Sequence, residues 1–245
     1  MSASFGTAIM RERSLRAPVA VRWSSLRLKC TDRSVYYPVH NNHEGVTMKL
    51  HDMTLSGNCH KVRLFLSLIG QPVELLPVDL LKGEQKQPAF RAINPRGQVP
   101  ALEDGEFRLG DSQAILVYLA RRYADECWYP LEAETQGRIA GWLSFAANET
   151  QHGPATVRVG KLFGMPIDAE LAQARALSAL RVLERHLAVH DWLAETAQPT
   201  IADIAVYPNV ALGGDGGLDL SQYPALQAWF ARIRALPGYV GMPGL

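Results

Sequence analysis

Residues 94–123 read NPRGQVPALEDGEFRLGDSQAILVYLARRY. Two short runs within this segment, 99–103 and 107–109, flank the turn signal Asp104-Gly105, and this pattern predicts a β-hairpin. Apolar residues then recur at helical spacing over 112–123, which predicts an amphipathic helix directly after the hairpin.

The residues before the hairpin extend this pattern into an α/β unit. The predicted elements are a strand at 48–53, a helix at 61–69, a strand at 71–79 and a loop with a short helix at 83–93. The predicted order up to residue 123 is therefore β-α-β-α-β-β-α, which is typical of an α/β domain.

Beyond residue 131 the pattern predicts helices only. They are expected at 132–151, 169–195, 201–212 and 223–235. The residues expected to form core contacts are Trp142, Phe145, Leu180, Leu183, Leu187 and Trp229. We therefore expect an α/β domain at 48–126 and an all-α domain at 131–245.

The first 47 residues fit neither domain. They are rich in Arg and Ser and lack sustained periodicity, whereas Met48 opens the first predicted strand. Three interpretations stay open: a translation start placed too far upstream, an organellar transit peptide, and a disordered or docking tail. In each case we expect residues 1–47 to be poorly ordered.

Charge and hydropathy exclude two classes of partner. Residues 1–47 carry seven of the 25 Lys and Arg residues and three of the 24 Asp and Glu residues, so the remainder has a formal charge of about −3. A mildly acidic body without a basic cluster argues against nucleic-acid binding. No run approaches the roughly 18 uncharged apolar residues that a membrane span needs. A small-molecule partner is expected instead.

The cysteines indicate a reducing compartment. Cys30, Cys59 and Cys127 are widely spaced, form no CxxC pair and have no histidine at ligand-like spacing around them. This pattern argues against a disulfide framework and against structural zinc, and it fits the cytoplasm. We therefore expect no metal.

Ser56 lies between the first predicted strand and the helix that follows it. A hydroxyl there can donate to an anionic sulfur at the helix N-terminus, although an ordinary N-cap is the alternative role. A thioredoxin-like dithiol enzyme needs cysteine at the first position of Ser56-x-x-Cys59, so dithiol exchange is disfavoured. A monothiol reaction at Cys59 stays open beside a buried structural role.

Two further helix starts carry polar pairs. At Asp111-Ser112, the backbone N–H groups and the Ser112 hydroxyl form a candidate carboxylate site, with an ordinary cap pair as the alternative. Thr200 and Asp203 have the spacing of a capping box, which we assign to folding.

Four segments in order resemble motifs of the glutathione S-transferase family. LSGNCHKVR at 55–63 is similar to the active-site loop of serine-type members, such as the theta and zeta classes and bacterial relatives. NPRGQVPAL at 94–102 resembles NPxGxVPxL, DSQAILVYL at 111–119 resembles the E-S-x-A-I-x-x-Y-L helix start, and TIADIA at 200–205 resembles the S/T-x-A-D box. The resemblance implies a thioredoxin-like N-terminal domain followed by an all-α C-terminal domain.

The resemblance also implies roles for individual residues. Ser56 would donate a hydrogen bond to the glutathione thiolate as the catalytic residue, and the backbone of Val99, before a cis Pro100, would pair with the cysteinyl part. Ser112 and Asp111 would bind the γ-glutamyl end, but Asp111 stands where Glu or Gln is more usual, so its contact stays open. The candidates for the glycine carboxylate are Gln85, Lys86 and Gln98, and Gln85 aligns best.

The second substrate is expected between the Ser56 loop and the inner helices, in a pocket lined by Asn58, Phe145, Asn148, His152 and Tyr207. His152 is either a general base or a cap or surface group. The function expected is conjugation of glutathione, as co-substrate, to a small hydrophobic electrophile by a cytoplasmic homodimer. The alternatives are a non-catalytic binding or regulatory protein of the same fold and a monothiol redox protein that uses Cys59.

Overall fold

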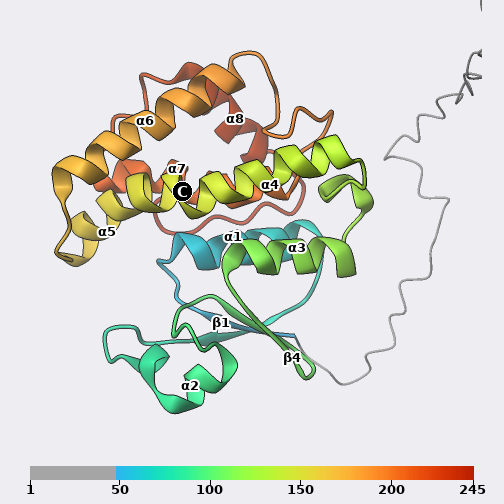
Figure 1. The fold of residues 1–245 in the computed structure, drawn as a ribbon, viewed down its shortest axis with the longest axis vertical. Coiled ribbons are helices and arrows are strands. Elements are labelled where there is room, and N and C mark those ends of the chain that lie inside the picture. Colours follow the sequence, from blue (N-terminus) through green and yellow to red (C-terminus); the bar gives the residue numbers. More distant parts are fainter. Residues whose placement is uncertain (1–47) are drawn as a thin grey trace, which may run out of the picture. The chain divides into compact units, whose positions relative to one another are not determined.

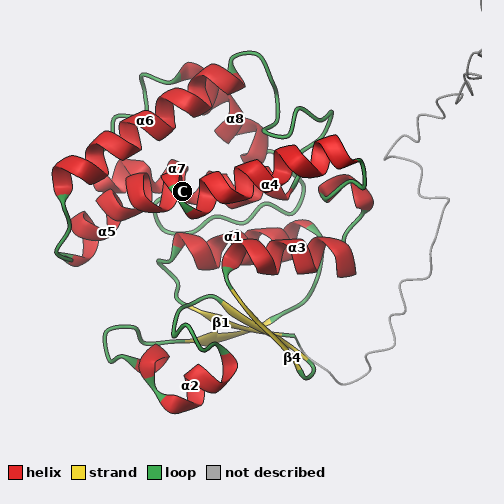
Figure 2. Cartoon of the chain, viewed as in Figure 1, coloured by secondary structure: helices red, strands yellow, loops and turns green. Residues whose placement is uncertain are grey.

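The computed structural model describes residues 48–245, and the expectations for residues 1–47 lie outside them. In the described part, a small sheet with helices is followed by a larger group of helices (Figure 1). Every regular element after residue 111 is helical (Figure 2). The predicted order of α/β elements followed by helices is therefore the order observed.

The sheet has four strands in the order β2-β1-β3-β4. They are β1 (Lys49–Asp52), β2 (Glu74–Pro77), β3 (Ala101–Asp104) and β4 (Phe107–Gly110). β1 pairs in parallel with β2 and antiparallel with β3, so that Leu50 lies opposite both Leu75 and Leu102. The mixed sheet places the end of β1, and the loop that follows it, near the centre of the domain.

Three α-helices complete the first domain: α1 (Gly57–Leu68), α2 (Pro88–Ile93) and α3 (Ser112–Tyr123). One 3-10 turn, Glu84–Lys86, precedes α2, and another, Glu126–Trp128, follows α3. Helices α1 and α3 cover the sheet face toward the helical domain, and α2 lies on the other side (Figure 1). Helix α1 begins four residues earlier than predicted because Ser56 caps it.

The helical domain contains α4 (Ala133–Ala147), α5 (Thr156–Phe163), α6 (Ala169–Leu187), α7 (Ile201–Ala211) and α8 (Pro224–Arg234). A π-helical turn, Gln151–Ala155, joins α4 to α5, and a 3-10 turn, Leu212–Gly216, follows α7. Among the described residues, no helix is long and apolar enough to cross a bilayer.

Two predicted helix boundaries in this domain are wrong. The helix expected at 132–151 ends at Ala147, and α5 was not predicted because Gly153 and Pro154 are strong helix-breaking signals. A Cβ at Gly153 would lie 2.8 Å from the backbone nitrogen of Ala176, so close packing against α6 requires glycine there. Helix α6 also ends at Leu187, well before residue 195.

Helix α7 forms the centre of the core. Its residues are buried on every side, and it packs against α1 and α4. Of the predicted core residues, Leu180, Leu183, Leu187 and Trp229 are buried, whereas Trp142 and Phe145 are half-buried and pack against the same cluster. The core therefore runs from the helical domain to α1 without interruption.

The capping box at the start of α7 is present and extends into a buried network. The carboxylate of Asp203 accepts from the backbone N–H groups of Thr200 at 2.9 Å and Leu193 at 3.0 Å, and from Trp229 Nε1 at 3.0 Å. Burial raises the pKa of Asp203, and these donors oppose that rise. Asp203 thus joins three segments of the helical domain.

We expect Asp203→Ala to lower the free energy of unfolding by roughly 3–5 kcal/mol, because three buried donors lose their acceptor. Urea unfolding followed by circular dichroism measures the change. Glu149→Ala, at an exposed position, is the control and should leave the midpoint close to that of the wild type. Equal midpoints for the two variants would contradict the role of Asp203.

Candidate functional site

The loop between β1 and α1 presents Ser56 at the N-terminus of α1. Ser56 has an extended backbone (φ −79°, ψ 118°), and its Oγ accepts from the backbone N–H of Cys59 at 3.2 Å. Ser56 is therefore an N-cap. Because this bond uses an acceptor lone pair, the hydroxyl proton can still be donated to an anion at the helix end. The cap and the proposed donor role are compatible.

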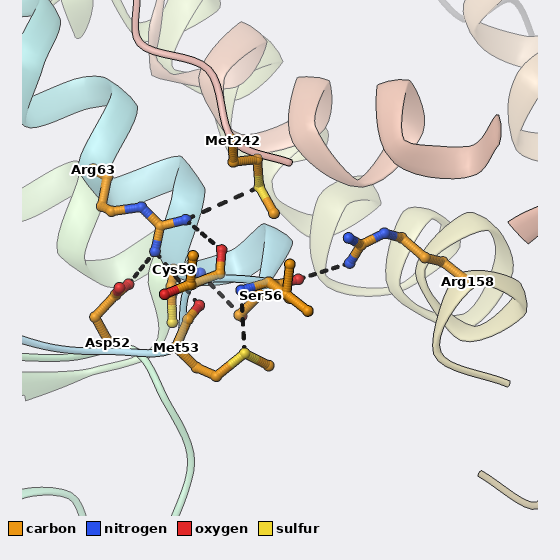
Figure 3. Close-up of polar contacts among 9 residues, drawn as sticks. Asp52, Met53, Ser56, Cys59, Arg63, Arg158 and Met242 are labelled. Carbon is orange, nitrogen blue, oxygen red and sulfur yellow. Dashed lines mark hydrogen bonds and ion pairs between the residues drawn. The ribbon is translucent and has the colours of Figure 1, made fainter. Parts of the chain in front are cut away.

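Arg63 of α1 holds this loop from one side (Figure 3). Its guanidinium contacts the carboxylate of Asp52, the carbonyl oxygen of Thr54 at 2.9 Å and the sulfur of Met242 at 4.0 Å. Arg63 lies within the motif at 55–63, but sequence analysis assigned it no role. The available signal in the sequence was a lone arginine between Val62 and the apolar run 64–66.

Arg158 of α5 holds the same loop from the helical domain (Figure 3). It is 5% exposed, donates to the carbonyl oxygen of Leu55 at 2.7 Å, and its Nε lies 2.9 Å from Asp215 Oδ2. A buried cation is tolerated when it is paired and hydrogen-bonded. Arg158 belongs to a helix that was not predicted, and no local pattern distinguishes it from a surface arginine.

Cys59 lies in the first turn of α1, three residues after Ser56, and is fully buried. Burial raises the pKa of the Cys59 thiol to about 12, and the hydrogen bond with Ser56 offsets only part of this rise. The thiol therefore stays protonated at neutral pH and is a poor nucleophile. The structure favours the buried structural role over a monothiol reaction.

Two more buried groups follow Cys59 on α1. Neither ring nitrogen of His60, nor the Nζ of Lys61, has a hydrogen-bond partner within residues 48–245. Burial lowers the pKa of His60 to about 3 and that of Lys61 to about 7, with Asp111 opposing the shift of Lys61. Lys61 is therefore a destabilising feature placed near the start of α3.

The start of α3 is built around Asp111, whose φ of 79° is unusual for a residue other than glycine. Its Oδ1 accepts from the backbone N–H groups of Gln113 at 2.9 Å and Ala114 at 3.2 Å, and its Oδ2 accepts from Arg96 at 3.0 Å. Ser112 is buried, with Oγ 2.6 Å from the Gln113 side-chain amide. Asp111 is thus a cap held by Arg96, a partner that sequence analysis missed.

The segment before β3 forms a tight turn. The Asn94 side chain donates to the carbonyl oxygen of Gln98 at 2.7 Å and accepts from the backbone N–H of Arg96 at 3.2 Å. The peptide bond from Val99 to Pro100 is cis, as the resemblance implies. Val99 is partly buried and Gln98 is exposed.

The loop that carries Gln85 lies against this turn. A Cβ at Gly97 would be 2.9 Å from the carbonyl oxygen of Gln85. The Gln85 side chain donates to the carbonyl oxygen of Leu80 at 3.4 Å, and its own side-chain oxygen is buried without a partner in the described part of the chain. The two glutamines predicted for the glycine carboxylate therefore lie on adjoining loops.

Asn58 joins the first domain to the helical domain. It donates to Gln151 at 3.0 Å and accepts from Asn209 at 3.2 Å. A Cβ at Gly57 would lie 2.2 Å from the side-chain oxygen of Asn209, so this contact depends on glycine. Gln151 and Asn209 were missed, although an amide within the apolar sequence of α7 was a usable signal.

Tyr207 lies inside the helical core, and this burial argues against its predicted place at a pocket surface. It is fully buried in the helical core, and its hydroxyl is 2.9 Å from that of Tyr239. Phe145 is half-buried against Trp142, and Asn148 and His152 are exposed close to Gln151 in the chain. The sequence placed Tyr207 on the pocket side because α7 is apolar on every face and its orientation could not be read.

Known protein families match both domains. The N-terminal domain of glutathione S-transferases matches residues 50–127, and their C-terminal domain matches residues 164–237. Human glutathione S-transferase theta-2 is 34% identical over 187 residues, which cover 72% of this chain and 76% of that protein.

Solved structures match the fold. The glutathione S-transferase from Pseudomonas fluorescens Pf-5 has a TM-score of 0.75 and 34% identity, covering 80% of this chain and 98% of that one. A glutathione transferase homologue from Drosophila mojavensis, solved with bound glutathione, has a TM-score of 0.71 and 25% identity, covering 78% of this chain and 89% of that one.

We expect Arg158→Met to loosen the 53–56 loop, because the carbonyl of Leu55 loses its donor from the helical domain. Hydrogen–deuterium exchange should show faster exchange in peptides that span residues 53–59 and unchanged exchange in α8. Arg181→Met, at an exposed position on α6, is the matched control. Protection of residues 53–59 equal to that of the wild type would contradict the bracing role.

We expect Lys61→Met to stabilise the protein by about 2–4 kcal/mol at pH 6.5, because it removes a buried group that must lose its proton or stay charged. The folded-state pKa of Lys61 lies near 7, below its ordinary 10.5, so the native state binds fewer protons than the unfolded state between these values. Wild-type stability therefore rises with pH across this window.

The gain from Lys61→Met should accordingly shrink between about pH 6.5 and about pH 9.5. Urea unfolding at both pH values measures it, with Lys86→Met as the exposed control. A gain that stays constant with pH would show that improved packing, and not charge, explains the effect.

Proposed function

This chain belongs to the glutathione S-transferase family, and we infer from that membership that it is an enzyme that binds glutathione and joins it to a small electrophilic substrate. The observation that carries the proposed mechanism is the Ser56 hydroxyl, which caps α1 and belongs to a loop held by arginines from both domains. Residues 48–126 are the proposed glutathione-binding domain, and residues 131–245 are the proposed electrophile-binding domain.

Ser56 is proposed to hold the glutathione sulfur as a thiolate. An ordinary thiol has a pKa of about 8.5, so only a few per cent is ionised at neutral pH. A hydrogen bond to a charged group contributes about 1.5–3 kcal/mol, which corresponds to roughly one to two pKa units. The N-terminal end of α1 adds to this effect because its dipole favours negative charge.

The bond from the Cys59 N–H to Ser56 supports the donor role. An N–H that donates to the serine oxygen polarises the hydroxyl and makes its proton a better donor. The thiol proton passes to solvent, and the thiolate attacks the electrophilic atom, so that a new C–S bond forms while the leaving group, if there is one, departs with the electron pair. Ser56 stays unmodified throughout.

The rest of glutathione is proposed to follow the loops of the first domain. The backbone of Val99 pairs with the cysteinyl part, and Ser112 with the start of α3 binds the γ-glutamyl carboxylate. The Asp111 carboxylate, which already contacts Arg96, is proposed to bind the amino group of the γ-glutamyl end. Gln85 and Gln98 are the proposed donors to the glycine carboxylate. Within residues 48–245 the side-chain oxygen of Gln85 has no hydrogen-bond partner, which supports a rearrangement of that side chain on binding.

The second substrate is proposed to lie beside Asn58, between the two domains. Asn58 is hydrogen-bonded to Gln151 and Asn209, and these three amides give the proposed pocket a polar surface. The exposed Asn148 and His152 lie beside Gln151 in the chain. By family membership, the protein is proposed to act in the cytoplasm as a homodimer on a small hydrophobic electrophile.

Ser56→Ala tests the mechanism through the pH dependence of thiolate formation. In the wild type, the ultraviolet absorbance of bound glutathione thiolate should titrate at least about one pH unit lower than in the variant. The kcat/KM for an aryl halide should be lower in the variant by about 10- to 100-fold near pH 6.5, and the two enzymes should converge at high pH, where the thiol ionises without help.

Cys59→Ala is the control, because its backbone N–H keeps the bond to Ser56 and its thiol takes no part in the proposed reaction. It should retain the wild-type titration. Loss of activity in Cys59→Ala with full activity in Ser56→Ala would support the monothiol alternative. Calorimetry of glutathione binding completes the test, since binding without thiolate formation indicates a protein of this fold without turnover.

A further inference from the structure

We propose that His186, His190 and Glu195 bind one divalent transition metal ion of the zinc class at the C-terminal end of α6. His186 lies in the last turn of α6, His190 follows four residues later, and Glu195 belongs to the segment that leads to α7. One potential ligand atom from each of the three lies within 4.8 Å of the others. None of these residues belongs to the proposed glutathione site.

One ring nitrogen of His186 is held by a backbone carbonyl group. Its Nε2 lies 3.0 Å from the carbonyl oxygen of Leu193, and because a carbonyl oxygen only accepts, Nε2 carries the hydrogen. In the neutral ring, Nδ1 then has the lone pair. A histidine that donates its other ring N–H to a backbone carbonyl has the arrangement typical of metal ligands.

The ring of His186 lies against two other aromatic rings. The ring lies 4.9 Å from that of Trp142 and 4.6 Å from that of His190, measured between ring centroids. A metal ion at this position would bind two imidazole rings that are already close together. Glu195 would be its single anionic ligand among the three residues.

Glu195 is held in an uncommon conformation. Its φ is 58°, in the left-handed region, and its backbone N–H donates to the carbonyl oxygen of Trp192 at 3.0 Å. Arg138 lies 3.3 Å from the Glu195 carboxylate, and both side chains are partly exposed. Arg138 is thus a competitor that a metal ion would displace from at least one carboxylate oxygen.

The donor set selects the class of ion. Two imidazoles and one carboxylate suit Zn²⁺, Ni²⁺ or Cu²⁺, whereas Mg²⁺ and Ca²⁺ prefer sites built from oxygen ligands. Three protein ligands leave at least one coordination position for water. His186 and His190, at i, i+4 spacing, lie far along the chain from the cysteines, so the cysteine pattern gave no sign of a metal site here.

Calorimetric titration of the untagged, chelator-treated full chain with ZnCl₂ tests the proposal. We expect binding of one equivalent, weakened at least about tenfold in His190→Gln and in Glu195→Gln, two changes near the surface that keep the fold. His40 and His43 are a second source of histidine ligands, so His40→Ala/His43→Ala is the matched control and should bind zinc as the wild type does.

Arg138→Gln should strengthen zinc binding several-fold, because it removes the cation that competes for Glu195. The ring contact between His186 and Trp142 offers a second readout: Cu²⁺ should quench the fluorescence of Trp142, and both Trp142→Phe and His190→Gln should reduce the quenching. Added zinc should raise the midpoint temperature of thermal unfolding in the wild type but not in His190→Gln.

The proposal is overturned if the wild type shows no zinc binding, or if His190→Gln binds zinc as tightly as the wild type. It is also overturned if zinc affinity is unchanged in both Arg138→Gln and Glu195→Gln, because Glu195 would then be no ligand.

Discussion

The proposed site depends on the ion pair and the hydrogen bond made by the buried guanidinium of Arg158. A cation that is almost fully removed from water must be paired, and Arg158 meets this requirement with the carboxylate of Asp215 and the carbonyl of Leu55. One partner lies in the helical domain and the other in the loop that carries Ser56. The helical domain therefore helps to shape a loop of the other domain.

Arg63 completes this arrangement from the opposite side. Together the two arginines engage the carbonyl groups of Met53, Thr54 and Leu55, so the backbone before Ser56 has little freedom to move. Each arginine is also paired with an aspartate, Asp52 or Asp215. The two arginines are therefore proposed to position the loop, whereas the Ser56 hydroxyl and the α1 N-terminus are proposed to stabilise the anionic sulfur.

The helical core is connected both to the loop that carries Ser56 and to the proposed metal site. Helix α7 is buried on every side because it packs against α1 of the first domain as well as α4 of the second. Its N-terminus is fixed by Asp203, and near its C-terminus Asn209 contacts Asn58 beside the Ser56 loop. The proposed metal site lies at the end of α6, where Leu193 accepts from His186 through its carbonyl and donates to Asp203 through its N–H.

What the amino-acid sequence determines here is local and ordered along the chain. The hairpin at 101–110, the helix at 112–123, the capping box at Thr200 and the order of elements follow from turn residues, periodicity and caps, which act within a few residues. Tertiary structure alone decides the partners of Arg158, Asn58 and Asp111, the burial of Tyr207 and the helical path through Gly153 and Pro154. Those outcomes depend on which surfaces meet when the domains pack, because the role of a buried charge or amide is set by a partner distant in sequence.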